Sequence, residues 1–185
     1  MRVKKAVILA GGKSSRMGKD KSLLPFGGFE TLAEYQYTRL KRVFDEVYIS
    51  TKEQKFNFQA PLIIDKEDTF SPLVALDSIL KILKSEIFVL GVDMPFVSDQ
   101  TIYKLLNYYN PQKDAIVAKN DKIEPLCGIY TPNILKNIKE LLSKDNHKLN
   151  YLLRISDTIV LDGFFEGEFI NLNYPKDYEQ ARSKE

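Results

Sequence analysis

The chain has very little of the residues on which several common kinds of site depend. Its 185 residues include one cysteine, one histidine and no tryptophan. The lone Cys127 excludes an internal disulfide, and the lone His147 leaves no histidine-based triad or zinc cluster available. Because Cys127 falls in the apolar stretch EPLCGIY and His147 in the polar stretch SKDNHKLN, we expect a small core residue and a surface residue, respectively.

A strong excess of charge of one sign is also absent. The chain carries 27 Lys and Arg residues against 25 Asp and Glu, a formal net charge of +2 at pH 7. So weak a field gives little reason to expect nucleic acid or an anionic membrane as the partner. No apolar run reaches the roughly 20 residues that a membrane span needs. The apolar N-terminal run ends in GGKSSR and not in a signal-peptide cleavage site, so we expect a cytoplasmic protein.

What remains is the composition of an ordinary globular protein, 44% hydrophobic and 28% charged. A chain of this length can bury a core without disulfides or metal ions. We find no repeat, low-complexity tract or linker in it. We therefore expect residues 1–185 to form a single domain.

Short apolar runs without polar alternation recur along the chain, as in strands that are covered on both faces. They lie at 7–9, 46–51, 61–65, 86–93 and 114–118. Between them, apolar residues follow helical spacing near 33–44, 73–83 and 102–109, and Ser98 stands where it can cap the third helix. Beyond residue 119 the pattern predicts a hairpin, a helix over 133–143, a further short helix, and strands over 158–163 and 168–172.

Strands that alternate with helices predict an α/β fold, here a Rossmann-like three-layer sandwich with a mostly parallel central sheet. In such sheets, ligands bind outside the carboxyl ends of the strands, where loops lead into helices. We therefore expect the functional site at that edge.

The stretch LAGGKSSRMGKDKS, residues 9–22, follows the first predicted strand at this edge. Glycines let the backbone approach a ligand and expose N–H groups to an anion. Four cations accompany them: Lys13, Arg16, Lys19 and Lys21. The stretch fits neither GxxxxGK[ST] nor GxGxxG. From these residues alone, a phosphate site and a solvated lysine-rich loop both stay open.

Two aspartates end apolar runs at the same edge. Asp93 follows IFVLGV, where a carboxylate could hold Mg²⁺ together with substrate phosphate oxygens, or could serve as a turn or capping residue. Asp65 ends PLIID in the same manner, but the charged residues after it leave a simple surface loop as the stronger alternative.

Taken together, these motifs resemble a known family. LAGGKSSRMGKDK matches the LAGGxxxRMGxDK opening of nucleotidyltransferases, which is shared across that superfamily. With IID followed by SPLVAL, then GVDMPFVS, EPLCGIY and NLNYPKDY, the chain resembles the molybdenum cofactor guanylyltransferases (MobA) over essentially its whole length.

The resemblance implies that the protein transfers GMP from GTP to the phosphate of molybdenum-molybdopterin and releases pyrophosphate. It implies that Lys21, Arg16 and Asp93 are catalytic, with Asp93 on Mg²⁺ and the two cations on phosphates. Leu9, Ala10, Gly11, Gly12 and Asp65 would meet the guanine nucleotide, together with Lys21 and Asp93, and Asn171 and Asn173 would face the pterin. Proteins that deliver molybdopterin or accept the product are further partners that it implies.

The sequence departs from the family pattern in three places. Ser50 stands where the family often has asparagine, Ser71 and Ala75 replace glycines, and Tyr174 replaces a threonine that would cap the last helix. Several alternatives also stay open. They are a cytidylyltransferase for molybdopterin or methylerythritol phosphate, a sugar-1-phosphate nucleotidyltransferase, and a nucleotide sensor without turnover.

Overall fold

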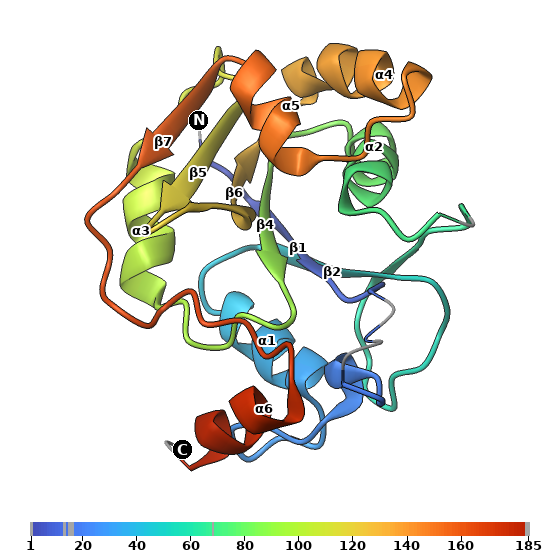
Figure 1. The fold of residues 1–185 in the computed structure, drawn as a ribbon, viewed down its shortest axis with the longest axis vertical. Helices are drawn as coiled ribbons and strands as arrows, with labels where there is room; N and C mark the ends of the chain where they lie inside the picture. The colour runs from blue at the N-terminus through green and yellow to red at the C-terminus, as the bar shows by residue number, and fades with distance from the viewer. Residues whose placement is uncertain (1, 13, 15–16, 68, 184–185) are drawn as a thin grey trace.

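The computed structural model describes residues 2–12, 14, 17–67 and 69–183 (Figure 1). A seven-stranded sheet lies at its centre, in the order β3-β2-β1-β4-β6-β5-β7. The strands are β1 (Lys5–Leu9), β2 (Glu46–Thr51), β3 (Leu62–Ile64), β4 (Ile87–Gly91), β5 (Ala115–Lys119), β6 (Ile123–Tyr130) and β7 (Thr158–Leu161). The helices are α1 (Leu32–Leu40), α2 (Pro72–Leu83), α3 (Asp99–Asn107), α4 (Leu135–Ser143), α5 (Leu149–Ile155) and α6 (Pro175–Arg182), with short 3₁₀ turns η1 (Lys21–Leu23) and η2 (Pro132–Ile134).

The sheet is mostly parallel, as the sequence predicts. β1 pairs in parallel with both β2 and β4, and β2 pairs in parallel with β3. β6 runs antiparallel between β4 and β5, and β7 is parallel to β5. The carboxyl ends of β1 to β4 therefore meet at one edge of the sheet.

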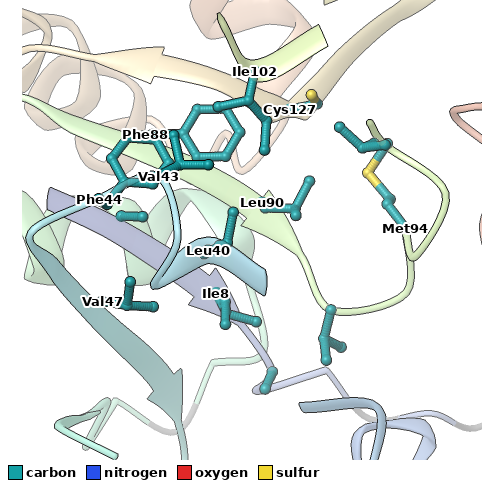
Figure 2. Packing of buried hydrophobic residues seen from close by; sticks show 14 of the residues in the cluster. Ile8, Leu40, Val43, Phe44, Val47, Phe88, Leu90, Met94, Ile102 and Cys127 are labelled. Atoms are coloured by element: carbon teal, nitrogen blue, oxygen red, sulfur yellow. The ribbon is translucent and has the colours of Figure 1, made fainter. Parts of the chain in front are cut away.

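Both faces of the sheet are covered by helices, which explains why its strands lack polar alternation. In β1, Val7 packs into the cluster that α2, α4 and α5 complete, whereas Ile8 faces the opposite cluster, built with α1 and α3. In the second cluster, Phe44 stacks on Phe88 of β4 with ring centroids 5.2 Å apart (Figure 2). The result is a single α/β domain of three layers.

Cys127 lies in the core, as the sequence predicts, whereas His147 lies in a loop but is only partly exposed. Cys127 of β6 is fully buried in this core, and burial raises the pKa of its thiol. His147 lies in the loop between α4 and α5, with its Nε2 3.0 Å from the Asp145 carboxylate. Within the described ranges, no helix is both long and apolar enough to cross a membrane.

The prediction of a strand over residues 168–172 is wrong. These residues form turns and extended chain outside the sheet. Phe169 and Leu172 are both buried in the same cluster although they are three residues apart, whereas a strand would send them to opposite faces. The Leu172 N–H donates instead to the carbonyl of Asp93 at 2.9 Å, which brings this C-terminal segment to the expected site.

Candidate active site

Main-chain hydrogen bonds hold the carboxyl ends of the first four strands together. They run from Val92 to Leu9 at 3.1 Å, from Ala10 to Ser50 at 2.8 Å and from Asp65 to Thr51 at 2.9 Å. A pocket opens over this edge. Among the residues that line it are six from the sequence prediction: Leu9, Gly11, Gly12, Lys21, Asp65 and Asp93.

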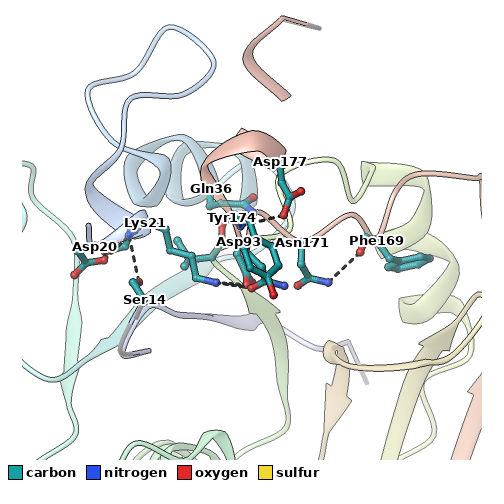
Figure 3. Close-up of polar contacts among 12 residues, drawn as sticks. Ser14, Asp20, Lys21, Gln36, Asp93, Phe169, Asn171, Tyr174 and Asp177 are labelled. Carbon is teal, nitrogen blue, oxygen red and sulfur yellow. Dashed lines mark hydrogen bonds and ion pairs between the residues drawn. The ribbon is translucent and has the colours of Figure 1, made fainter. Parts of the chain in front are cut away.

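A lysine, a carboxylate and an amide from distant parts of the chain meet at this pocket. Lys21 Nζ lies 2.5 Å from Asp93 Oδ2 (Figure 3). The same Nζ lies 3.1 Å from Asn173 Oδ1. The side chains of Lys21 and Asp93 are only 15% and 13% exposed, so water screens this pair less than a surface pair. The contact joins the glycine loop, the end of β4 and the C-terminal segment at one point.

Asp20 caps η1, the 3₁₀ turn that begins at Lys21. Its Oδ1 accepts hydrogen bonds from the Ser22 backbone N–H at 3.0 Å and from the Ser22 hydroxyl at 2.7 Å, which caps η1. Its Oδ2 pairs with Lys55 Nζ at 2.5 Å. Burial by itself raises the pKa of Asp20, but the hydrogen bonds from Lys55 and Ser22 and the charge of Lys55 outweigh it and lower the pKa below its ordinary value.

Side chains of α1 hold the loop that carries Asp93. Gln36 is fully buried and donates to the Met94 carbonyl at 3.0 Å, and Arg39 donates to the Pro95 carbonyl at 2.6 Å. The Asp93 carboxylate itself folds back over Gly91, where an added Cβ would lie 2.8 Å from Asp93 Oδ1. Glycine at the end of β4 therefore leaves room for the carboxylate.

Lys52 ties the loop after β3 to the end of β2. Its Nζ lies 2.6 Å from Asp65 Oδ2, and it also donates to the carbonyls of Glu67 and Thr69. The ammonium stands 5.2 Å from the ring centroid of Phe70, and Lys52 and Phe70 both line the pocket. One lysine thus holds the wall of the pocket that includes Asp65.

The donor set suits a hard cation that takes few protein ligands. In the part of the chain that the structure describes, no three His, Cys, Asp or Glu residues gather closely enough to form a protein cage for a metal. Asp93 and Asn173 instead present two oxygens to one point, which Lys21 Nζ contacts. Mg²⁺ usually takes one or two carboxylates plus substrate phosphates, so these residues fit it.

Known proteins share the sequence pattern and the fold of this chain. Residues 6–159 match the MobA-like NTP transferase domain. The chain belongs to the MobA-like NTP transferase family. Proteins named molybdenum cofactor guanylyltransferase from Campylobacter jejuni and Helicobacter pylori are 38% and 36% identical to it, covering 96% and 95% of this chain and 95% and 90% of their own.

A solved structure shows the same fold. Molybdopterin-guanine dinucleotide biosynthesis protein A from Archaeoglobus fulgidus has a TM-score of 0.82 over 97% of both chains, at 21% identity. The family match and the relatives together identify this protein as an enzyme, a nucleotidyltransferase.

The remaining residues of the sequence prediction that the structure describes do not line this pocket. Ala10 is buried, and its carbonyl accepts from Lys55 at 3.1 Å. Asn173 reaches Lys21, whereas Asn171 donates to the Phe169 carbonyl at 3.1 Å. Arg16 lies outside the described residues, so its role stays a prediction.

The structure shows the surroundings of the residues that depart from the family pattern. Ser50, Ser71 and Ala75 all line the pocket, and the Ser71 hydroxyl also caps α2 by accepting from Val74 at 3.5 Å. At the start of α6, the Asp177 carboxylate accepts from the Tyr174 N–H at 3.0 Å, the reverse half of a capping box. A threonine is therefore not needed to begin this helix.

Sequence reasoning missed Lys52 and Lys55. A signal for Lys52 was present, because it directly follows the β2 strand at the edge where ligands bind. Lys55 offered no such signal. Its role depends on the path of the loop after β2, which brings it 2.5 Å from Asp20.

The Lys52 contacts predict an effect on nucleotide affinity. Lys52→Met removes the donor to Asp65 and to two loop carbonyls, so the pocket wall loosens. We expect the KM for the nucleotide to rise about tenfold with little change in kcat. Lys52→Arg should recover part of the loss, and Lys66→Met, an exposed lysine of the same loop, serves as control. An unchanged KM in Lys52→Met would contradict this role.

The lowered pKa of Asp20 predicts a pH-dependent contribution to stability. The unfolded state binds a proton near the ordinary pKa of 3.8, whereas the folded state resists it, so the contribution is complete above 3.8 and is lost as the pH falls below it. Asp20→Asn keeps a capping oxygen but loses the charge. We expect it to cost about 0.5–1 kcal/mol at pH 6, with the difference from wild type shrinking below pH 3.8. Urea denaturation at both pH values measures it, and a pH-independent difference would refute it.

Proposed function

We propose that this enzyme transfers GMP from GTP to the phosphate of molybdenum-molybdopterin, forming the guanine dinucleotide form of the cofactor and pyrophosphate. The contact of Lys21 with Asp93 and Asn173 is the observation that carries the proposal, since it joins a phosphate-loop cation, a carboxylate suited to Mg²⁺ and the C-terminal segment at one pocket. The names of the Campylobacter and Helicobacter relatives support this choice of substrates.

The glycine loop suits the triphosphate. A Cβ on Gly12 would meet no atom of the described residues within 4 Å, so packing does not require glycine there. Glycine is instead suited to close approach of the backbone to a ligand. Gly11 and Gly12 line two adjoining hollows together with Lys52, and the second of these also includes Lys55. Backbone N–H groups and lysines together favour an anionic ligand.

The reaction needs alignment and charge neutralisation more than proton transfer. An oxygen of the molybdopterin phosphate forms a bond to the α-phosphorus of GTP, while the bond from that phosphorus to the bridging oxygen breaks and pyrophosphate leaves. The attacking phosphate is largely ionised near neutral pH, so no general base is required. Positioning and electrostatic stabilisation then supply most of the catalysis.

The residues divide this work between them. Asp93, with Asn173 beside it, would hold Mg²⁺, which supplies positive charge against the repulsion between the two phosphates. Lys21 would turn from the Asp93 carboxylate to the phosphates when they bind. Arg16 would assist Lys21 on the leaving pyrophosphate, as the family resemblance implies.

Product analysis tests this function. The enzyme is incubated with Mg²⁺, molybdenum-molybdopterin and an equimolar mixture of GTP and CTP, and the products are separated and identified by mass. We expect the guanine dinucleotide as the main product. A cytosine dinucleotide would replace the proposal with a cytidylyltransferase, and GTP binding without any dinucleotide would indicate another acceptor or a sensor.

A further inference from the structure

A further hollow lies near the proposed site and has no role in the reaction described above. The turn between β5 and β6 forms one side of it, and the segment that follows β7 forms the other. Its lining includes Glu124, Glu166, Phe169 and Ile170. From Phe169 the chain continues directly to Asn173, which contacts Lys21, so one short segment runs from this hollow to the reaction centre.

Glu124 is a buried carboxylate in this hollow. The residue is only 7% exposed. Its one ion pair in the described part of the chain is with Lys122, at 4.0 Å, and that lysine side chain is 74% exposed. No hydrogen-bond donor of the described residues reaches the Glu124 carboxylate. Burial raises its pKa, Lys122 opposes the rise, and the nearby charge of Asp93 adds to it.

The other buried carboxylates of the described chain all accept hydrogen bonds. Asp65 accepts from Lys52, Asp114 accepts from the Asp157 N–H at 2.9 Å, and Glu168 accepts from the Thr101 hydroxyl. A carboxylate with few hydrogen-bond donors gains from a ligand that supplies them, and Glu124 lines a hollow through which such a ligand can reach it. Glu124 is therefore the exception, and a ligand with N–H donors would satisfy it.

We propose that Glu124 recognises the pyrimidine ring of the pterin in the acceptor substrate, an inference that rests on the proposed function. The 2-amino-4-oxo-pyrimidine ring carries a ring N–H beside an amino group, two adjacent donors that a carboxylate accepts in pairs. Guanine presents the same edge. Glu124, however, lies in a hollow separate from the pocket of Gly11 and Gly12, on the side of the C-terminal segment. The pterin is therefore the favoured ligand.

The shape of the acceptor agrees with this placement. Molybdopterin has its phosphate at one end and its pyrimidine ring at the other. With the phosphate at Lys21 and Asn173, the ring system would lie along residues 169–173, with its pyrimidine end toward the hollow that Glu124 lines. Phe169 and Ile170 add apolar lining to a hollow that is otherwise polar, as an aromatic ring requires.

Glu124→Gln tests the proposal, because the amide keeps the size of the side chain and removes the charge. Binding of molybdopterin is measured by fluorescence without nucleotide, so the result does not depend on turnover. We expect the Kd to rise about 10- to 100-fold. We also expect the KM for molybdopterin to rise while the KM for GTP stays within about twofold. Glu166→Gln, an exposed carboxylate of the same hollow, is the matched control and should change neither.

Stability separates recognition from a structural role. Removing a buried charge that lacks donors should leave the thermal midpoint of Glu124→Gln unchanged or raised, whereas a structural carboxylate would lower it. Unchanged molybdopterin binding would overturn the proposal, and so would a rise in the KM for GTP alone, which would place guanine at Glu124. If wild type binds molybdopterin through Glu124 but forms no dinucleotide, the proposed function fails and this inference stands.

Discussion

Lys21→Ala should lower the rate of nucleotidyl transfer by about 10²- to 10³-fold, the range found when one charge-stabilising donor is lost. Lys21 Nζ lies 2.5 Å from Asp93 and 3.1 Å from Asn173, at the mouth of the pocket that Gly11 and Gly12 line. The growing negative charge on the transferred group and on pyrophosphate would lose a cation that lines this pocket. Single-turnover measurements isolate the chemical step from nucleotide binding.

Lys19→Ala is the matched control for this prediction. Lys19 belongs to the same loop but is exposed and lines a different hollow, beside α6. Its replacement should leave the rate within about twofold, since exposed charges contribute little. Wild-type turnover in Lys21→Ala would show that this lysine does not support catalysis. An equal loss in both variants would show that the general charge of the loop supports it.

Asp93→Asn should lower the transfer rate by about 10³-fold at ordinary Mg²⁺ concentrations and shift the Mg²⁺ dependence to higher concentration. Asparagine keeps the shape of the side chain, so its fold over Gly91 is preserved. What is lost is the negative charge that a hard cation requires from its few protein ligands. A Mg²⁺ titration of the rate, fitted for each variant, gives the shift.

Two further measurements keep the Asp93 result interpretable. Asp99→Asn, in the first turn of α3, removes a carboxylate near the same loop and should leave the Mg²⁺ dependence unchanged. GTP binding without Mg²⁺ should persist in Asp93→Asn, because the pocket wall is intact. A normal Mg²⁺ response in Asp93→Asn would show that the metal is held elsewhere.

The fold was predictable from the sequence because its central strands are buried on both faces. Val7 and Ile8 pack into clusters on opposite faces of the sheet, so both positions of the strand are apolar. An apolar run of this kind is typical of a buried strand. A strand was wrongly predicted over residues 168–172 because a run of apolar residues alone resembles a strand. Only the three-residue spacing of Phe169 and Leu172, which bury the same face, separates it from one.

The site was predictable where it depends on topology. Gly11, Asp65 and Asp93 each follow a parallel strand, and such strands bring their carboxyl ends to one edge. Lys55 and Glu124 were not predictable in the same way. The role of Lys55 depends on the path of the loop after β2, and the burial of Glu124 depends on a segment some 45 residues later, near Phe169.

Pyrophosphate release tests the central claim most directly. Purified enzyme with Mg²⁺ is given GTP or CTP separately, with and without molybdenum-loaded molybdopterin, and the pyrophosphate is quantified. The proposed function predicts release only when GTP and molybdopterin are both present, with Lys21→Ala strongly impaired under the same conditions. Tight GTP binding with no pyrophosphate released in the presence of molybdopterin would contradict it.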